Sequence, residues 1–393
     1  MITVEEAKAI VIGSANKLNK SFTRKINNCS GYFISENIHS PLDLPPFDQS
    51  NVDGYVTVFS SSNSRKITGE IKAGDNPKIK IKSGQCARIF TGAVVPKGSD
   101  FVVMQEDVIR NQNRMMLNDA NAIKDDLIRK RGSQIRKGEL AVPKGTYINP
   151  AVSGFLAALG LEKVKVFRKP EISLLITGNE LQSPGEKLKF GKVYDSNSFI
   201  ISSALEKMGL NARDTIFNKD DKDILKKSVS ELLELSDVIL ISGGVSVGKY
   251  DFVNEVLDEL GVKRLFYKVS QRPGKPFYFG KKDSTYIFGL PGNPASVFTC
   301  FYEYVYPLLR KLQGYSDHFL QVRYLTAVNE INKKFKMANF LKAKTSGSTV
   351  ESLEGQASYI LRTFAEADCF IYLPADKFVV RKGEETEVHM FPY

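Results

Sequence analysis

The chain has 393 residues, of which 42% are hydrophobic and 25% charged, and this composition is typical of a globular protein. A chain of this length is too long for a single hydrophobic core. We expect roughly two to four domains. Lys and Arg outnumber Asp and Glu by 55 to 44, and the net charge of +11 favours anionic partners. The basic residues are dispersed without interleaved aromatics, so a nucleic-acid partner is not expected.

The four cysteines lie far apart, form no Cys-x-x-Cys pair and accompany only three histidines. This pattern predicts neither a zinc site nor a disulfide framework, and a reducing cytoplasm is the simplest location. The N-terminus carries acids where a signal peptide needs bases, and no apolar run approaches the ~18 residues that span a bilayer. We expect a cytoplasmic protein that is neither secreted nor embedded in a membrane.

The N-terminal region is predicted to start with a helix and to continue as mainly β structure. Thr3 and Glu6 form a capping-box pattern ahead of apolar residues at helical spacing, which predicts a helix over 3–15. From about 20 to 168, short apolar runs alternate with clusters of Pro, Gly, Asn and Asp, as expected for strands joined by turns. One helical segment, over 152–161, interrupts this pattern.

At Pro170 the pattern changes to alternating strands and helices. The buried strands are expected over 172–177, 212–217, 238–242, 264–269 and 286–290. A long helix is expected over 294–312. This alternation predicts a doubly wound α/β domain with a largely parallel sheet over 169–314. Beyond it, short alternating runs predict a small β domain.

The sequence ILISGGVSVGKYD, residues 239–251, is the most informative motif of the α/β region. A buried strand that breaks into a glycine-rich turn before a helix leaves backbone N–H groups at one edge of the sheet, which suits an anionic ligand. Only three residues separate Gly244 from Gly248, and Tyr250 stands where a Walker A loop has Ser or Thr. The motif is therefore not a P-loop.

Acidic residues follow the first three strands of this region. They are Glu180, Asp220, Asp221 and Asp251. Ligands bind beyond the carboxyl ends of the strands in open α/β sheets, and Mg²⁺ is usually held by one or two carboxylates plus substrate phosphates. These acids therefore predict a Mg²⁺ site, with a helix N-cap as the alternative role for Asp221 and Asp251.

Two proline-glycine loops bring cations and N–H groups to the same edge. In QRPGKPF, residues 271–277, prolines restrict the backbone that carries Arg272 and Lys275. In GLPGNPAS, residues 289–296, Pro294 opens a helix and would leave the following N–H groups free for an anion. Each loop alone is more often an ordinary turn, whereas together they predict an anion pocket beside the metal.

The mainly β region has two loops rich in turn-forming residues. SPLDLPPFDQSNVDGYV, residues 40–56, places Asp53 before a glycine, and RIFTGAVVPKGSD, residues 88–100, places Thr91 directly after a strand. So many turn-formers beside acids favour a functional loop. The spacing does not say whether these loops reach the α/β site.

Taken together, the motifs resemble the molybdopterin molybdotransferase family, bacterial MoeA and the gephyrin E domain, along the whole chain. The motifs, in order, are FDQSNVDGY, ARIFTGAVVP, VVMQE, ITGNEL, VYDSNS, ISGGVSVGKYD, PGKPF and GLPGNPAS. The resemblance implies a mainly β region with a protruding subdomain over 1–168, a central MogA/MoaB-like molybdopterin-binding α/β domain over 169–314, and a C-terminal β-barrel-like domain over 315–393. It also implies an elongated homodimer in which N-terminal loops of one subunit complete the cleft of the other.

The activity implied by the resemblance is the last step of molybdenum cofactor biosynthesis. Molybdenum from molybdate enters adenylylated molybdopterin, AMP is released and Mg²⁺ is needed; a molybdopterin adenylyltransferase is the implied partner. By motif, the catalytic residues are Asp53, Thr91, Glu180, Asp220 and Asp251. The metal ligands among them are Glu180, Asp220 and Asp251. The substrate-binding residues are Ser242, Gly243, Gly244, Ser246, Gly248, Arg272, Pro273, Lys275, Pro291, Asn293, Pro294 and Ser296.

The chain departs from the family pattern at a few positions. It has QSNVDGYV where the family often has NSAMDGYA, Arg272 where the family has Lys, and Ser133 and Gln134 where Glu-Asp is usual. The loss of two acids predicts weaker binding of metal or molybdate on that side of the cleft. Two alternatives stay open. One is a tungstate-inserting homologue, and the other is a non-catalytic scaffold with the same fold, against which the complete acidic set argues.

Overall fold

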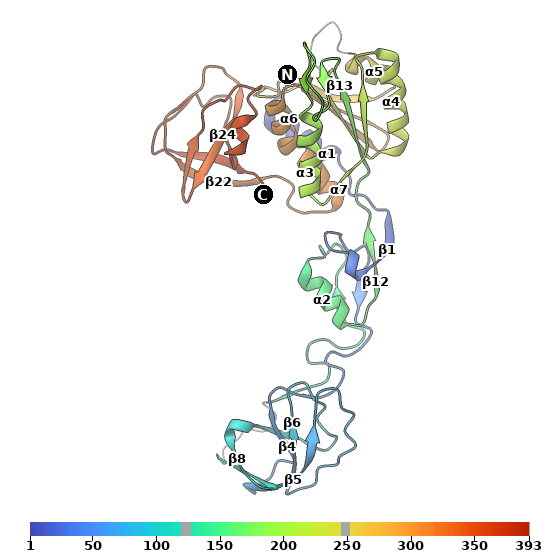
Figure 1. The fold of residues 1–393 in the computed structure, drawn as a ribbon, viewed down its shortest axis with the longest axis vertical. Helices are drawn as coiled ribbons and strands as arrows, with labels where there is room; N and C mark the ends of the chain where they lie inside the picture. Colours follow the sequence, from blue (N-terminus) through green and yellow to red (C-terminus); the bar gives the residue numbers. More distant parts are fainter. Residues whose placement is uncertain (119–126, 245–251, 393) are drawn as a thin grey trace. The chain divides into compact units, whose positions relative to one another are not determined.

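The computed structural model of the chain (Figure 1) describes all residues except 119–126, 245–251 and 393. The chain divides into two compact units, one formed by Met1–Phe22 with Phe167–Tyr393 and the other by Thr23–Val166. Each unit contains its own buried apolar clusters. Within the described ranges, none of the helices has the length and apolar character needed to span a bilayer.

The unit Thr23–Val166 is mainly β, as its short apolar runs predict. Its principal sheet has the strand order β7-β4-β6-β5-β9-β8, in which β5 and β6 are parallel and the other pairs antiparallel. The strands are β4 (Gly54–Thr57), β5 (Ser64–Ile71), β6 (Gln85–Ile89), β7 (Phe101–Met104), β8 (Val108–Asn111) and β9 (Arg114–Leu117). Val56, Ala87 and Val102 belong to the buried core of this sheet.

Helix α2 (Pro150–Ala158) is the helix predicted over 152–161. It begins earlier because the Asn149 side chain accepts a hydrogen bond from the Val152 N–H at 2.9 Å and Pro150 fits the first helical position. Leu156 packs with Val142 in a separate small core. Short strands in this part of the chain are β1 (Ser21–Lys25), β2 (Ile38–His39), β3 (Gln49–Ser50), β10 (Ile128–Arg129), β11 (Leu140–Val142) and β12 (Lys163–Phe167).

The other unit contains the predicted α/β domain. Its sheet has the order β16-β13-β17-β21-β20-β18. The strands are β13 (Ile172–Thr177), β16 (Ala212–Asn218), β17 (Val238–Ser242), β18 (Lys263–Lys268), β20 (Pro276–Lys282) and β21 (Thr285–Leu290). The first four strands in the order are parallel to one another, whereas β20 and β18 run antiparallel. The expectation of a largely parallel sheet is confirmed, with an antiparallel edge that the sequence did not reveal.

Helices cover both faces of this sheet (Figure 1). Leu174 and alternate residues of β13 pack against α1 (Val4–Ser14), α3 (Asn197–Lys207) and α6 (Pro294–Cys300) on one face. Leu175 faces the opposite side and packs against α4 (Lys222–Leu235) and α5 (Val253–Glu259). In α1 the predicted capping box is present, since Thr3 and Glu6 exchange hydrogen bonds at 2.8 and 3.1 Å. Burial on both faces explains why these strands read as continuous apolar runs.

The helix predicted over 294–312 consists of three consecutive segments, α6, the π-helical turn η3 (Phe301–Val305) and α7 (Tyr306–Gln313). Pro307 has no N–H to pair with the carbonyl of Glu303, as an α-helix would require. The wider π-helical turn just before the proline accommodates this missing hydrogen bond locally. The helix ends at Gly314, which is left-handed with φ 105°.

The C-terminal part forms a closed barrel-like sheet, as expected. The order β19-β24-β25-β22-β28-β26 closes through an additional pairing of β24 with β26. The strands are β19 (Gln271–Arg272), β22 (Gln321–Ala327), β24 (Ala338–Ser346), β25 (Thr349–Ser352), β26 (Cys369–Leu373) and β28 (Glu385–Met390). Val350, Ile371 and Val388 fill its interior. Because β19 lies within QRPGKPF, this loop is tied to the C-terminal sheet.

Candidate functional site

Strand register brings the predicted loops of the α/β domain to one edge of the sheet. Thr177 is aligned with Asn218 on β16, and Ser242 is aligned with Ile176 on β13 and Leu290 on β21. The residues that follow these strand ends therefore lie along one edge. This is the edge at which open α/β sheets bind ligands.

Asp220 is held at this edge by two hydrogen bonds. Its Oδ1 accepts from the Thr177 hydroxyl at 2.6 Å and its Oδ2 from the Asn179 backbone N–H at 3.1 Å. Its neighbour Asp221 instead caps helix α4, accepting from the backbone N–H groups of Asp223 and Ile224, each at 3.0 Å. The structure therefore assigns the capping role to Asp221 and leaves Asp220 at the candidate site.

Glu180 follows β13 with an exposed side chain. A Cβ added to Gly178 would lie 2.9 Å from one of its carboxylate oxygens, so the carboxylate folds back over this turn. Asp251, the third predicted metal ligand, lies outside the described residues, as do Ser246 and Gly248. In the described ranges, no three His, Cys, Asp or Glu side chains gather as a metal-binding group.

The glycine pair after β17 lies close to the neighbouring strand. A Cβ on Gly243 would approach the Thr177 carbonyl oxygen to 2.1 Å, and Gly243 has φ 95°, so only glycine fits. Its N–H donates to the Leu290 carbonyl at 3.3 Å. The prediction of bare N–H groups is therefore wrong for Gly243, because a neighbouring strand end already uses this donor.

The loops QRPGKPF and GLPGNPAS line a cavity of about 460 Å³. Among its lining residues are Arg272, Pro273, Lys275, Pro291, Asn293 and Ser296. The Arg272 guanidinium lies over the Phe335 ring, 4.6 Å from its centroid. In the described part of the chain, no acidic side chain pairs with Arg272 or Lys275, and both are exposed. The cavity is therefore lined by two cations without an acidic partner among the described residues, and its role as an anion pocket stays a prediction.

Pro294 occupies the first position of α6, as expected. The following N–H, that of Ala295, is not free, because it donates to the Ser358 carbonyl at 3.1 Å. The Asn293 amide also donates to the Ser358 hydroxyl at 3.2 Å. The prediction of free N–H groups is wrong at Ala295, since a loop of the C-terminal domain packs on the helix start.

A second cavity of about 470 Å³ lies beside Asp220. Its lining includes Asn179, Lys192, Asp195 and Lys219. Lys192 donates to the Asn179 carbonyl, so this cation is held next to the turn that carries Glu180. Neither lysine was predicted to have a role, because isolated lysines between loops carry no motif.

Asp53 and Thr91 contact each other in the unit Thr23–Val166. Asp53 Oδ1 accepts hydrogen bonds from both the backbone N–H and the hydroxyl of Thr91, each at 2.8 Å. These bonds, the backbone one first, hold the pKa of Asp53 below its ordinary value. Gly54 follows within β4, where a Cβ would lie 1.9 Å from the Val103 carbonyl oxygen. The hydrogen bonds of Thr91 therefore fix the Asp53 carboxylate and favour its ionised form.

The chain was compared with known proteins. Three family models match it in order: MoeA N-terminal region (domain I and II) over residues 2–160, probable molybdopterin binding domain over 173–311, and MoeA C-terminal region (domain IV) over 325–391. A molybdopterin molybdenumtransferase of Haemophilus influenzae is 30% identical and covers 100% of this chain and 99% of its own. The chain belongs to the MoeA family.

Other MoeA relatives agree. A molybdopterin molybdenumtransferase of Nostoc is 34% identical over 82% of this chain and 78% of its own length. The crystal structure of a molybdopterin biosynthesis MoeA protein from Pyrococcus horikoshii has a TM-score of 0.85 at 32% identity, with both chains fully covered. The MoeA fold expected from the motifs is thus confirmed. The curated relatives are transferases by name, so the MoeA family is a family of enzymes.

Asn197 connects two of the predicted binding loops, and sequence reasoning did not predict this contact. Its buried amide donates to the Ser242 hydroxyl at 3.0 Å and to the Gly292 carbonyl at 2.9 Å, joining two predicted binding loops. Asp195 fixes the start of its helix by accepting from the N–H groups of Asn197 and Ser198. VYDSNS was recognised as a motif, but none of its residues was assigned a role in the site.

A short basic run, Arg129, Lys130 and Arg131, precedes Gly132 in this MoeA chain and contacts the loop at residues 40–56. The Arg131 Nε lies 2.6 Å from Asp43, and Lys130 lies 3.6 Å from Asp48. The Arg131 N–H also donates to Asp48 at 2.8 Å. Ser133 and Gln134, at the departure from the family pattern, have exposed side chains and donate their N–H groups to nearby carbonyls. The basic run therefore stiffens this loop.

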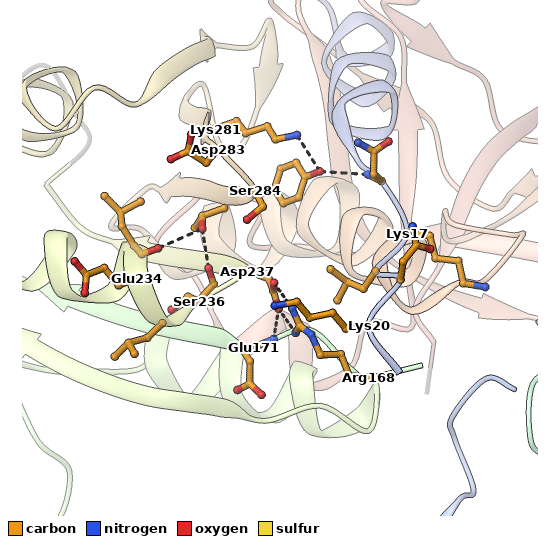
Figure 2. Close-up of a pocket in the computed structure, with 17 residues that line it drawn as sticks. Lys17, Lys20, Arg168, Glu171, Glu234, Ser236, Asp237, Lys281, Asp283 and Ser284 are labelled. Carbon is orange, nitrogen blue, oxygen red and sulfur yellow. Dashed lines mark hydrogen bonds and ion pairs between the residues drawn. The ribbon is translucent and has the colours of Figure 1, made fainter. Parts of the chain in front are cut away.

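A third cavity, of about 760 Å³, lies at the opposite, amino-terminal ends of β13, β17 and β21 (Figure 2). None of the predicted site residues lines it. Arg168 and Asp237 form a two-point ion pair there, with contacts of 2.5 and 2.7 Å, and Asp237 also accepts from the Glu171 N–H. Because cations and acids both line it, its charge selects no ligand class. Its size alone does not make it the MoeA site.

Proposed function

We propose that the protein is a molybdopterin molybdotransferase, which inserts molybdenum from molybdate into adenylylated molybdopterin and releases AMP. The observation that carries the proposal is the register that brings Glu180 and Asp220 to one sheet edge with the loop ends after Ser242 and Leu290. The match to molybdenumtransferases over the whole chain supports it. This is the last step of molybdenum cofactor biosynthesis.

The charges of the pocket suit two anionic substrates. Molybdate and the phosphoanhydride linkage of the adenylylated pterin repel each other, and cations between them reduce that repulsion. Arg272 and Lys275 line one cavity, and Lys192 and Lys219 line the other. In this proposal the first pair binds molybdate or a phosphate and the second pair binds the nucleotide side. The planar Arg272 guanidinium favours bidentate contact with an oxyanion.

Magnesium is the cofactor that we propose for this edge. Glu180 and Asp220 offer carboxylate oxygens, the ligands that Mg²⁺ prefers, and Asp220 keeps lone pairs beyond its bonds to Thr177 and Asn179. When bound, the ion would neutralise charge on the phosphate during cleavage of the P–O bond. Thr177 and Asn179 orient the Asp220 carboxylate for that role.

Asp53 is proposed to position water or metal for the same reaction. Its ionised state follows from the two hydrogen bonds of Thr91. We propose a homodimer in which Asp53 of one subunit serves the cleft of the other. A molybdopterin adenylyltransferase is the proposed source of substrate. Four buried, free cysteines fit the proposed cytoplasmic location.

The decisive experiment measures AMP release from adenylylated molybdopterin, with molybdate and Mg²⁺ each present or omitted. We expect AMP and active cofactor only when both are present. A folded protein that releases no AMP under any of these conditions would favour the scaffold alternative. Competition between molybdate and tungstate in the same assay separates the tungstate-inserting alternative, because preferred incorporation of tungsten would replace molybdate as the substrate.

A further inference from the structure

Two buried polar side chains under the loop at residues 271–275 take no part in the chemistry proposed above. Gln271 is fully buried, and its amide donates to the Pro273 carbonyl at 3.0 Å. The carbonyl oxygen of that amide accepts a hydrogen bond from the hydroxyl of Tyr304, which is also fully buried. Buried polar groups need partners because an unpaired one loses its solvation without compensation. Each of these side chains therefore depends on the other.

We propose that Gln271 and Tyr304 are positioning residues that fix the backbone of residues 272–275, and with it the directions in which Arg272 and Lys275 enter the pocket. The identity of the ligand in the pocket rests on the proposed function. The part of the proposal that concerns how the loop is fixed rests on geometry alone.

The loop lies directly against the buried pair. A Cβ on Gly274 would come within 2.9 Å of the Gln271 amide nitrogen and 2.5 Å of the Cys300 sulfur, and Gly274 has φ 90°. The Val269 N–H closes the loop by donating to the Lys275 carbonyl at 3.2 Å. The backbone that carries Arg272 and Lys275 thus packs on the side-chain amide of Gln271.

Tyr304 connects the loop to the most irregular part of the long helix. It lies in the π-helical turn η3, and such turns occur frequently at functional sites. Its ring centroid is 4.8 Å from that of Phe277, which follows the loop in β20. Burial raises the pKa of Tyr304 well above its ordinary value, so the hydroxyl remains a donor at working pH.

Three variants separate positioning from simple stability. Gln271→Met leaves the Tyr304 hydroxyl without its acceptor and the Pro273 carbonyl without the amide donor, and Tyr304→Phe leaves the side-chain carbonyl of Gln271 without its donor. The double variant loses both members of the Gln271–Tyr304 bond, so that only the Pro273 carbonyl lacks its former donor. We expect each single variant to be destabilised, and the double variant to regain part of that stability. Tyr278→Phe is the matched control, because Tyr278 is a fully buried tyrosine whose hydroxyl has no partner among the described residues.

The first readout is the rate at which Cys300 reacts with a thiol reagent in the folded protein, measured by mass spectrometry. Cys300 lies buried under Gly274, and buried Cys369 in the C-terminal sheet serves as internal reference. We expect faster labelling of Cys300 alone in Gln271→Met, Tyr304→Phe and the double variant. Unchanged labelling in these variants overturns the proposal. This readout needs no substrate, so it tests whether Gln271 and Tyr304 fix the loop even if the wild type releases no AMP.

The second readout is the rate of AMP release as a function of molybdate concentration, from which KM for molybdate and kcat are obtained. We expect kcat/KM to fall between about tenfold and 100-fold in both single variants and in the double variant, since small displacements of binding groups have effects of that size. The loss should lie mainly in KM, and Tyr278→Phe should match the wild type. If the double variant recovers wild-type kcat/KM together with its stability, the pair is only structural and the proposal fails. If the wild type itself is inactive, the proposed function fails instead.

Discussion

The Glu303 carboxylate and the His389 imidazole contact each other inside the core, with Oε1 2.8 Å from Nδ1. Lys8 lies 2.5 Å from the other oxygen of Glu303, and Glu387 lies 3.0 Å from the other nitrogen of His389. These residues come from α1, η3 and β28, so the network joins the N-terminal helix, the α/β domain and the C-terminal barrel. Breaking a buried ion pair on one side costs about 3 kcal/mol or more.

The pH dependence of this network can be predicted from its two pKa shifts. Burial alone would raise the pKa of Glu303, but His389 and Lys8 outweigh it and hold the value at about 2, below the ordinary 4.5. Burial would lower the pKa of His389, but its two carboxylate partners raise it above the ordinary 6.5. The Glu303 contribution is lost as pH falls through about 2, and that of His389 as pH rises through its raised pKa.

We therefore expect His389→Gln to lower the free energy of unfolding most between pH 4.5 and 6.5. In this window both charges are present in the folded state and neither has lost its contribution. Denaturant unfolding of wild type and variant at several pH values measures the difference. His39→Gln, at an exposed histidine, is the control. An equal loss at pH 5 and pH 10 would show that the pair is not charged.

Asp53 and Thr91 should act together in catalysis. Asp53→Ala is expected to reduce AMP release by about 100-fold or more, as loss of a group that positions water or metal does, without unfolding the protein. Thr91→Val removes one of the two hydrogen bonds to Asp53 and should cause a smaller loss. Near-normal AMP release by Asp53→Ala, with intact circular dichroism, would contradict the role.

Asp221 provides a control for the acids of the proposed metal site. Glu180→Ala and Asp220→Ala should abolish Mg²⁺-dependent AMP release. Asp221→Ala should instead keep the activity and lose about 1 kcal/mol of stability, because Asp221 caps helix α4. Kinetics as a function of Mg²⁺ concentration, with thermal unfolding of the same samples, checks both outcomes. A loss of activity in Asp221→Ala without loss of stability would reverse the assignment of the two acids.

The departure at Ser133 and Gln134 can be tested by reverting it. Their exposed side chains leave room for Glu and Asp. If the N-terminal side of the cleft attracts Mg²⁺, Ser133→Glu with Gln134→Asp should lower the Mg²⁺ concentration for half-maximal activity by roughly threefold, the effect of two screened surface charges. Ser133→Gln with Gln134→Asn introduces side chains of the same size without charge and is the control. No difference between the two double variants would remove these positions from the metal argument.

Elements buried on both faces were the easiest to predict from the sequence. The strands predicted over 172–177 and 238–242 agree with β13 and β17 to the residue, because uninterrupted apolar runs identify strands covered on both faces. Strand β20 was missed, since its first residues were interpreted as part of the QRPGKPF loop. Its antiparallel direction follows from the tight hairpin that joins it to β21, and Asp283 in the turn of this hairpin has φ 50°.

The site was predictable where chemistry follows a strand end and unpredictable where distant segments use the same atoms. Asp220 was identified from its place after a strand. The occupied N–H groups of Gly243 and Ala295 depend on Leu290 and Ser358, which only tertiary packing brings near. The same is true of the pairing between Gln271 and Tyr304, because a buried glutamine in a loop has no sequence signature.

Gln271 and Arg272 in β19 pair with Ala338 and Asn339 in β24. The C-terminal barrel is therefore part of the structure that forms the cavity at the loops QRPGKPF and GLPGNPAS. The C-terminal barrel also supplies Phe335 beneath Arg272 and Ser358 at the start of α6. A protein truncated near Gly314 would therefore keep every acid of the sheet edge and yet lose the contacts that support Arg272. Domain-swapped hybrids of MoeA proteins should accordingly exchange the barrel together with the 271–275 loop.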